Sequence, residues 1–344
     1  MKDVGLVGLP AAGKTTVFNA LTRAGLAAGG AAGRASVAAV PVPDPRVDVL
    51  SELERSRKRV HTQLRFVDVA GLAAGGVLSA QGLGALREAD ALAMVLGAHT
   101  GADPAEQAAD LTLELTLADL ASVAGGADKA AKRARAGVKG ADVEAATLAR
   151  ARALLDAGTP LRAAGWEPQE QAVLRNFAPL TLKPVLAVVN LGEGELGEAA
   201  GRAAAVEQAL GVPAVALAGA LEAEAAELAP EDAAAFLAEY GVKRGGLDQV
   251  VGAAWRLLDL ITFLTTGRDE TRAWEVRRGA TAPEAAGRIH SDLERGFIRA
   301  EVIGYEELVA AKGWDAARAR GLLRAEGRSY VVREGDCLNI RFNV

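Results

Sequence analysis

The stretch Gly8-Leu9-Pro10-Ala11-Ala12-Gly13-Lys14-Thr15 fits the pattern G-x-x-x-x-G-K-[ST]. An apolar run, Val4–Leu9, enters this stretch, and residues Thr15–Ala24 follow with apolar side chains at helical spacing. A strand, a tight loop and a helix in this order point backbone N–H groups and the positive end of the helix at one anion. The sequence therefore predicts a loop that binds the phosphates of a nucleotide.

Individual residues of this loop suit a magnesium nucleotide. The Lys14 ammonium group can reach oxygens of the β- and γ-phosphates, and the Thr15 hydroxyl can coordinate Mg²⁺. Gly8 and Gly13 allow the backbone to turn its N–H groups inward. The alternative is a chance match, because the chain holds 39 glycines. The strand before the loop and the helix after it argue against chance.

A carboxylate ends a second predicted strand, in Phe66-Val67-Asp68-Val69-Ala70-Gly71. An acid at the carboxyl end of a strand is placed to hold Mg²⁺, directly or through water. We therefore expect Asp68 to join Thr15 at the metal, and the backbone N–H of Gly71 to contact the γ-phosphate. The alternative is that Asp68 caps the next helix.

A third element, Asn190-Leu191-Gly192-Glu193, follows the predicted strand Val185–Val189. Related P-loop GTPases carry N-K-x-D at this place, and the Asp accepts two hydrogen bonds from guanine. Here Leu191 replaces the Lys and Glu193 replaces the Asp, and the longer carboxylate spoils the geometry that selects guanine. Adenine offers N6 as donor and N1 as acceptor, so the pattern favours ATP or relaxed selection. A surface turn is the alternative interpretation.

Apolar runs that alternate with helical patterns predict an α/β fold, with a mostly parallel sheet covered on both faces. Its other strands are expected at Val37–Val42, Leu64–Val69, Ala91–Leu96 and Val212–Leu217. About ninety residues separate the strands that end near Leu96 and begin near Pro184, too many for a simple crossover.

Helical patterns over Ala105–Ala124 and Val143–Ala157 predict a helical hairpin inserted at this connection. Residues 129–139 at its tip contain no acid. The basic residues there are Lys129, Lys132, Arg133, Arg135 and Lys139. A solvated helix end and a contact for phosphate-rich RNA are both compatible with this charge.

The last part of the chain predicts a small mixed α+β domain. Leu260–Leu264 and Arg272–Val276 are expected to pair as strands, and Pro283–Arg295 to form a helix with proline near its start. Further strands are expected at Phe297–Ile303, Tyr330–Val332 and Leu338–Phe342.

The composition argues against several classes of protein. No run of about 18 residues is continuously apolar, so we expect no membrane span, and we see no signal peptide. One cysteine and three histidines favour neither an internal disulfide nor a histidine metal site. A net charge of −5 over 344 residues argues against uniform coating of nucleic acid. We expect a cytoplasmic monomer.

With the three nucleotide elements in order, the sequence resembles the YchF/Obg-like ATPase family over almost its whole length. Other runs carry the resemblance as well. They are Pro41-Val42-Pro43-Asp44-Pro45-Arg46, Leu260-Ile261-Thr262-Phe263, Arg272-Ala273-Trp274, Thr281-Ala282-Pro283, Ile289-His290, Glu294-Arg295-Gly296-Phe297-Ile298-Arg299-Ala300-Glu301 and the ending DCLNIRFNV from Asp336 to Val344.

The resemblance implies a P-loop NTPase domain, an inserted α-helical hairpin and a C-terminal TGS domain with the ubiquitin-like β-grasp fold. We therefore expect residues 1–110 and 180–258 to form the P-loop domain, 111–179 the hairpin, and 259–344 the TGS-like domain. The resemblance also implies slow, Mg²⁺-dependent ATP hydrolysis by a switch protein that contacts the ribosome. The basic tip and the TGS-like domain are then the expected contacts for rRNA or tRNA.

Residue by residue, the resemblance places the phosphates and the base. Leu72 takes the place where Ras-like GTPases keep a catalytic Gln, an apolar substitution that the family shares. Leu191 lies by the base, between Asn190 and Glu193. The residues that wrap the phosphates are Ala11, Ala12, Gly13, Lys14, Thr15 and Thr16.

Some positions depart from the family pattern. The family has Asn, a candidate potassium ligand, at the place of Ala11, and this difference argues against potassium activation. Ala32 aligns with the switch I Thr that completes Mg²⁺ coordination, and Ala73–Gly84 lacks the lysines of switch II. We therefore expect base and phosphate binding to survive, with weaker sensing of the γ-phosphate and slower turnover.

Three functions stay open at this point. The first is an ATP-hydrolysing switch that binds GTP more weakly. The second is a GTP-specific GTPase of the Obg type. Glu193 is the residue that distinguishes the ATP-hydrolysing switch from such a GTPase. The third is a nucleotide-sensing, ribosome-binding module with negligible hydrolysis.

Overall fold

The computed structural model describes residues 1–22, 36–69, 79–242 and 245–343. By packing, the chain divides into two compact units. The N-terminal unit consists of Lys2–Ala39 and Arg65–Ala254. The C-terminal unit consists of Met1, Val40–Leu64 and Trp255–Val344. No helix in the described part of the chain is long and apolar enough to cross a membrane.

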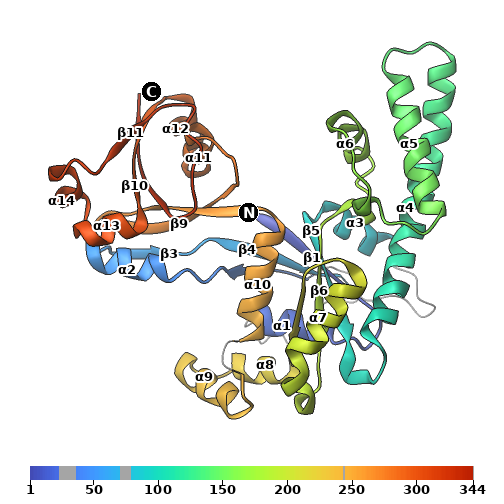
Figure 1. Cartoon of the computed structure of the whole chain (residues 1–344), viewed down its shortest axis with the longest axis horizontal. Coiled ribbons are helices and arrows are strands. Elements are labelled where there is room, and N and C mark those ends of the chain that lie inside the picture. Colours follow the sequence, from blue (N-terminus) through green and yellow to red (C-terminus); the bar gives the residue numbers. More distant parts are fainter. Residues whose placement is uncertain (23–35, 70–78, 243–244, 344) are drawn as a thin grey trace. The chain divides into compact units, whose positions relative to one another are not determined.

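Figure 1 shows the elements in the colours of the sequence. The strands are β1 (Lys2–Gly8), β2 (Ser36–Pro41), β3 (Lys58–Val60), β4 (Gln63–Asp68), β5 (Ala91–Gly97), β6 (Val185–Asn190), β7 (Ala214–Leu217), β8 (Leu260–Thr265), β9 (Glu270–Arg277), β10 (Phe297–Gly304), β11 (Arg324–Glu326) and β12 (Asp336–Phe342). The α-helices are α1 (Lys14–Thr22), α2 (Pro45–Glu54), α3 (Ala80–Glu88), α4 (Pro104–Arg135), α5 (Ala141–Asp156), α6 (Pro168–Arg175), α7 (Ala199–Leu210), α8 (Gly219–Ala226), α9 (Pro230–Glu239), α10 (Gly246–Leu257), α11 (Ala282–Ile289), α12 (Ser291–Arg295), α13 (Tyr305–Ala311) and α14 (Trp314–Ala319). Short 3₁₀ helices are η1 (Ala98–Thr100), η2 (Leu161–Ala163), η3 (Leu180–Leu182) and η4 (Glu193–Glu198).

The sheet of the N-terminal unit has the order β2-β4-β1-β5-β6-β7. Strand β5 pairs in parallel with β1 and β6, and β6 pairs in parallel with β7. Every residue of β5 and β6 is buried, as expected for parallel strands that are covered on both faces. The predicted P-loop α/β fold with a mostly parallel sheet is confirmed. The carboxyl ends of β1 and β6 lie at one edge and position the loops that follow them.

Helices α4 and α5 lie side by side as the predicted hairpin (Figure 1). Helix α4 continues to Arg135, beyond the expected end at Ala124. Gly125 and Gly126 follow Ala124 inside the helix, and Gly126 has a packing role. A Cβ atom at Gly126 would lie 2.3 Å from Cε1 of Phe177. The missing side chain therefore makes room for an aromatic ring and does not end the helix.

The hairpin is fastened to the end of the insertion through Asp119 of α4, which is fully buried. Its Oδ1 accepts a hydrogen bond from the backbone N–H of Leu180 at 2.8 Å. Its Oδ2 accepts from the backbone N–H and the hydroxyl of Thr181, both at 2.7 Å. Because a buried donor without an acceptor is costly, this carboxylate holds η3 against α4.

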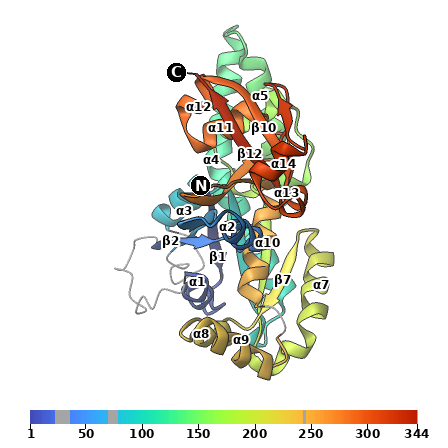
Figure 2. The same ribbon diagram turned by 90° about the vertical axis from the view of Figure 1, so that its left-hand side faces the viewer.

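The C-terminal unit has a sheet in the order β11-β10-β12-β8-β9-β3. Strands β8 and β9 form an antiparallel hairpin, β12 runs parallel to β8, and β10 runs antiparallel to β12. Helices α11 and α12 lie together beside β10 (Figures 1 and 2). A hairpin, a helix and a last strand parallel to the first follow the order of a β-grasp fold. The TGS assignment stays a prediction.

Two sequence predictions for this unit were wrong in detail. The helix expected over Pro283–Arg295 is two helices, because His290 adopts extended backbone and caps α12. Its Nδ1 accepts a hydrogen bond from the N–H of Asp292 at 3.2 Å. The strand expected at Tyr330–Val332 is reduced to an isolated bridge between Val331 and Thr281.

Residues 40–64 pack with the C-terminal unit, although we expected them in the P-loop domain. Strand β3 pairs in parallel with β9, with Lys58 opposite Glu270. Val47 and Leu50 of α2 are fully buried in a cluster with Ile303. Long-range pairing of this kind leaves no local signal in the sequence. The predicted division into domains otherwise stays a prediction.

Replacing Asp119 by Ala should lower the free energy of unfolding by about 3 kcal/mol, because the donors of Leu180 and Thr181 lose a charged acceptor. Urea denaturation followed by circular dichroism measures the loss. Asp128→Ala is the matched control, since Asp128 lies on the same helix with its side chain 73% exposed. Equal losses in both variants would contradict the role of Asp119.

Candidate functional site

The phosphate loop joins the carboxyl end of β1 to the first residue of α1, Lys14. The backbone N–H of Ala12 donates to the carbonyl of Leu9 at 3.2 Å and closes the turn. Ala11 and Gly13 both adopt the left-handed region, with φ of 62° and 83°. This conformation costs an L-residue about 1 kcal/mol, a strain that the loop carries at Ala11.

Asn190 holds the loop in this shape. Its side-chain amide Nδ2 donates to the carbonyl of Ala12 at 3.0 Å, and its Oδ1 accepts from the N–H of Gly219 at 2.8 Å. Asn190 is only 4% exposed. A Cβ atom at Gly13 would lie 2.0 Å from Nδ2 of Asn190. The amide therefore joins the phosphate loop to the start of α8, and Gly13 leaves the space that it needs.

Lys14, Thr15 and Asp68 meet between α1 and β4. The Thr15 hydroxyl donates to Oδ2 of Asp68 at 3.1 Å, and Nζ of Lys14 lies 3.8 Å from Oδ1. Burial raises the pKa of Asp68 above its ordinary value, while Lys14 and Thr15 act in the opposite direction. The sequence predicted that these three side chains share one site, and the structure brings them together.

The oxygen atoms of this cluster fit a magnesium ion. Oδ1 of Asp68 is buried and has no hydrogen-bond partner among the described residues. A buried carboxylate oxygen without a hydrogen-bond partner is rare in proteins, and hard divalent cations prefer carboxylate and hydroxyl oxygens. Thr15 and Asp68 are therefore the residues that could hold Mg²⁺.

Leu191 and Glu193 lie after β6, as the sequence placed them, but their environments differ. Leu191 is 3% exposed and packs in the apolar core of the N-terminal unit. Glu193 begins η4, and its exposed side chain makes no hydrogen bond or ion pair with a described residue. Its carboxylate is thus available to a ligand.

Two residues beside the loop have no signal in the sequence. Nδ1 of His99 lies 3.2 Å from the carbonyl oxygen of Asn190. The side chain of Gln107 is buried and pairs with the backbone of Gly97, accepting from its N–H at 2.8 Å and donating to its carbonyl at 3.1 Å. Both fix the end of β5 next to the phosphate loop, although neither belongs to a recognisable motif.

Gly71, Leu72 and Ala32 lie outside the described residues, so their expected parts stay predictions. Gly8 and Ala12 stand in the phosphate loop, where a Cβ atom at Gly8 would lie 3.6 Å from that of Ala12. Thr16 follows in the first turn of α1.

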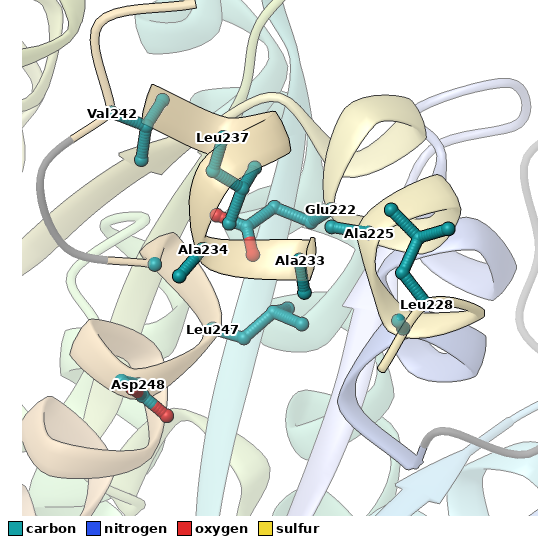
Figure 3. A pocket seen from close by; sticks show the side chains of 11 residues that line it. Glu222, Ala225, Leu228, Ala233, Ala234, Leu237, Val242, Leu247 and Asp248 are labelled. Carbon is teal, nitrogen blue, oxygen red and sulfur yellow. The ribbon is translucent and has the colours of Figure 1, made fainter. Parts of the chain in front are cut away.

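A cavity of about 210 Å³ lies next to α8 (Figure 3). Its lining is mostly apolar and includes Leu237 and Leu247, with two carboxylates, Glu222 and Asp248. Oε1 of Glu222 accepts from the N–H of Gly246 at 2.5 Å, at the start of α10. Burial raises the pKa of Glu222. The Glu222 carboxylate stabilises the first turn of α10, whereas Asp248, on the same helix, is exposed.

Gly13→Ala should weaken binding of a fluorescent ATP analogue at least about tenfold, because the new Cβ atom would displace Asn190 and with it the loop. Gly101→Ala is the matched control: φ at Gly101 is 80°, but a Cβ atom there meets nothing within 4 Å. Both variants carry the cost of a left-handed alanine, and only the first carries the clash. Equal affinities would show that the contact with Asn190 is not needed.

Comparisons with known proteins cover both parts of the chain. The family described as 50S ribosome-binding GTPase matches residues 3–123. The family of YchF GTPase C-terminal domains, described as a protein of unknown function, matches residues 260–343.

Similar proteins span nearly the whole length. The ribosome-binding ATPase YchF of Haemophilus ducreyi is 38% identical over 359 residues, with 99% of each chain covered. Its namesake in Bacillus subtilis is 37% identical over 362 residues, again with 99% of each covered. Obg-like ATPase 1 of Oryza sativa is 32% identical, over 99% of this chain and 92% of the rice protein. The solved structure of the Schizosaccharomyces pombe YchF GTPase matches with a TM-score of 0.83 and 25% identity, covering 99% of this chain and 97% of that one.

Proposed function

This chain belongs to the YchF/Obg-like ATPase family, and from that premise we propose that it is a switch protein that binds and slowly hydrolyses ATP with Mg²⁺ and associates with the ribosome. The observation that carries the proposal is the meeting of Lys14, Thr15 and Asp68 beside a loop braced by Asn190. The names of the relatives support ATP hydrolysis and ribosome binding.

Different residues of the site contact different parts of the triphosphate and its metal ion. Backbone N–H groups from Ala11 to Thr16 bind phosphate oxygens, and the Lys14 ammonium group pairs with the β- and γ-phosphates. Thr15 and Asp68 hold Mg²⁺, and Gly71 contacts the γ-phosphate. When bound, Mg²⁺ neutralises charge on the phosphate oxygens. Because Ala11 offers no ligating side chain, we propose that potassium does not activate the enzyme.

The same geometry supports adenine as the preferred base. Glu193 is exposed and unpaired among the described residues, whereas both polar atoms of the Asn190 side chain are taken by backbone. Asn190 is thus a positioning residue, and base selection falls to the carboxylate of Glu193. A second candidate function is a GTPase, since the S. pombe relative is named a GTPase.

The ribosome contact that we propose is the basic tip of the hairpin. Lys129, Lys132, Arg135 and Lys139 are exposed and have no ion pair with a described residue. Arg133 pairs with Glu144 at 3.0 Å and is therefore less available. Exposed, unpaired cations suit the phosphates of rRNA or tRNA. We propose the TGS-like domain as a second contact, and a monomer in the cytoplasm as the working form.

We expect this chain to bind ATP more tightly than GTP, and Glu193→Asp to narrow the difference, because the shorter carboxylate can accept two hydrogen bonds from guanine. Calorimetry with both Mg²⁺ nucleotides measures the ratio. Leu191 is left unchanged because a lysine there would also disturb the core. Glu198→Asp, on the same 3₁₀ helix, is the control. A wild-type preference for GTP would favour the second candidate.

Lys14→Ala and Asp68→Asn should each reduce ATP hydrolysis at least about tenfold, since each removes a group that meets the triphosphate or its metal. Phosphate release, with and without ribosomes, measures the rate. Lys58→Ala is the control, with a side chain that is 66% exposed on β3. If the wild-type chain released no phosphate in either condition, the non-hydrolysing module would replace the ATPase.

The double variant Lys132→Ala/Arg135→Ala should weaken co-sedimentation with ribosomes, most clearly at low salt, because fewer counterions are released on binding. Arg152→Ala, on the neighbouring helix α5, is the control: Arg152 lies 3.7 Å from Asp128 and is therefore already paired. If the double variant co-sedimented with ribosomes as well as the wild-type chain does, the basic tip would not be a ribosome contact.

A further inference from the structure

A cationic cavity lies in the N-terminal unit, where the end of α3 meets the end of the insertion. Its volume is about 380 Å³, within the range of sites that bind small molecules. Its charged lining is Arg87, Glu88, Arg175 and Lys183, which gives three cations against one acid. None of the phosphate-loop residues contributes to it.

Arg87 is the most constrained of these cations. Its Nε is buried and has no hydrogen-bond partner among the described residues. One Nη atom makes a long hydrogen bond of 3.3 Å to the carbonyl of Ala118, and no carboxylate in the described chain forms an ion pair with the guanidinium group. An unsatisfied buried donor on a charged group is costly unless an acceptor binds there.

The other two cations leave the cavity positive. Arg175 is exposed and has neither an ion pair nor a side-chain hydrogen bond with a described residue. Nζ of Lys183 donates to the backbone carbonyls of Arg87, at 2.9 Å, and of Ala89, so it closes the last turn of α3 and stays at the cavity. Burial lowers the pKa of Lys183, with Asp90 and Asp119 opposing.

Two acids near the cavity, Asp119 and Asp90, attract its cations but make their hydrogen bonds to other groups. Asp119 turns its oxygens to the donors of Leu180 and Thr181, and Asp90 pairs with Lys2 at 2.5 Å. Glu88 is exposed and reaches the cavity as its one acid. The guanidinium groups of Arg87 and Arg175 therefore have unused donors, and a planar fork of donors matches the oxygens of a phosphate group.

We infer that this cavity, formed by Arg87, Arg175 and Lys183, binds the phosphate group of a small phosphorylated molecule, at a site separate from the phosphate loop. Nε of Arg87 and the guanidinium group of Arg175 donate to the phosphate oxygens. Lys183 adds charge from the end of α3. The site stands apart from the nucleotide chemistry proposed above, because none of its residues touches Lys14, Thr15 or Asp68.

Calorimetric titration of the full-length Lys14→Ala chain with inorganic phosphate tests this site, since that substitution weakens the competing phosphate loop. We expect saturable binding that falls about tenfold in Lys14→Ala/Arg175→Ala, the loss of one charged hydrogen bond. Arg320→Ala on the same background is the control, because Arg320 is also exposed and has no ion pair with a described residue. Arg87→Lys, which removes the Nε donor, should weaken binding similarly.

The outcomes separate the possible sources of the phosphate. Binding of inorganic phosphate that depends on Arg175 supports the site, and competition by a phosphate monoester supports a small ligand. No saturable binding, or equal binding in the Arg175 and Arg320 variants, overturns it. Binding of a short RNA through Arg175 without binding of inorganic phosphate also overturns it, in favour of a nucleic-acid surface. If the Arg87→Lys variant does not fold, the phosphate titration of the Arg175→Ala variant is the deciding measurement, because Arg175 is exposed.

Discussion

One buried amide, that of Asn190, fixes the shape of the nucleotide loop. It gives its donor to the carbonyl of Ala12 and its acceptor to the N–H of Gly219, so two loops far apart in sequence share one rigid group. The left-handed backbone at Ala11 and the bare Cα of Gly13 make sense as consequences of that contact. From Gly219 the chain enters α8, whose Glu222 stabilises the start of α10. A loop that must hold a polyanion is thus supported by neutral hydrogen bonds that salt does not screen.

The buried atoms of four charged side chains fall into two groups, according to whether they have hydrogen-bond partners. Asp119 and Glu222 are satisfied by backbone N–H groups and serve the architecture. Asp68 and Arg87 each keep a buried atom without a hydrogen-bond partner among the described residues. The first group stabilises helix ends and connections, and the second is poised to gain from a ligand.

Local signals in the sequence were enough for the elements that are periodic and fully buried. Strands β5 and β6 are continuous apolar runs, and the loop before Lys14 has a strict spacing of glycines. Predictions from local sequence were wrong where a tertiary contact overrode the local preference for starting or ending a helix. Gly126 continues a helix because Phe177 occupies its space, and His290 interrupts one because its ring caps the next. Residues 40–64 run from the end of β2 to the start of β4, two strands of the N-terminal sheet. Strand β3 lies within these residues but pairs with β9 of the C-terminal sheet.

By itself, the sequence determined the phosphate loop, the parallel sheet, the inserted hairpin and the meeting of Thr15 with Asp68. These features depend on spacing, apolar runs and the edge at which parallel strands end, all of which are local or follow from topology. Only the tertiary structure decided that Asn190 braces the loop, that Leu191 is core, and that His99 and Gln107 support the site. It alone brought Arg87 and Arg175 to one cavity. The physical reason is that hydrogen bonds and charges act over a few ångströms, whereas the groups that share them stand tens of residues apart in the chain.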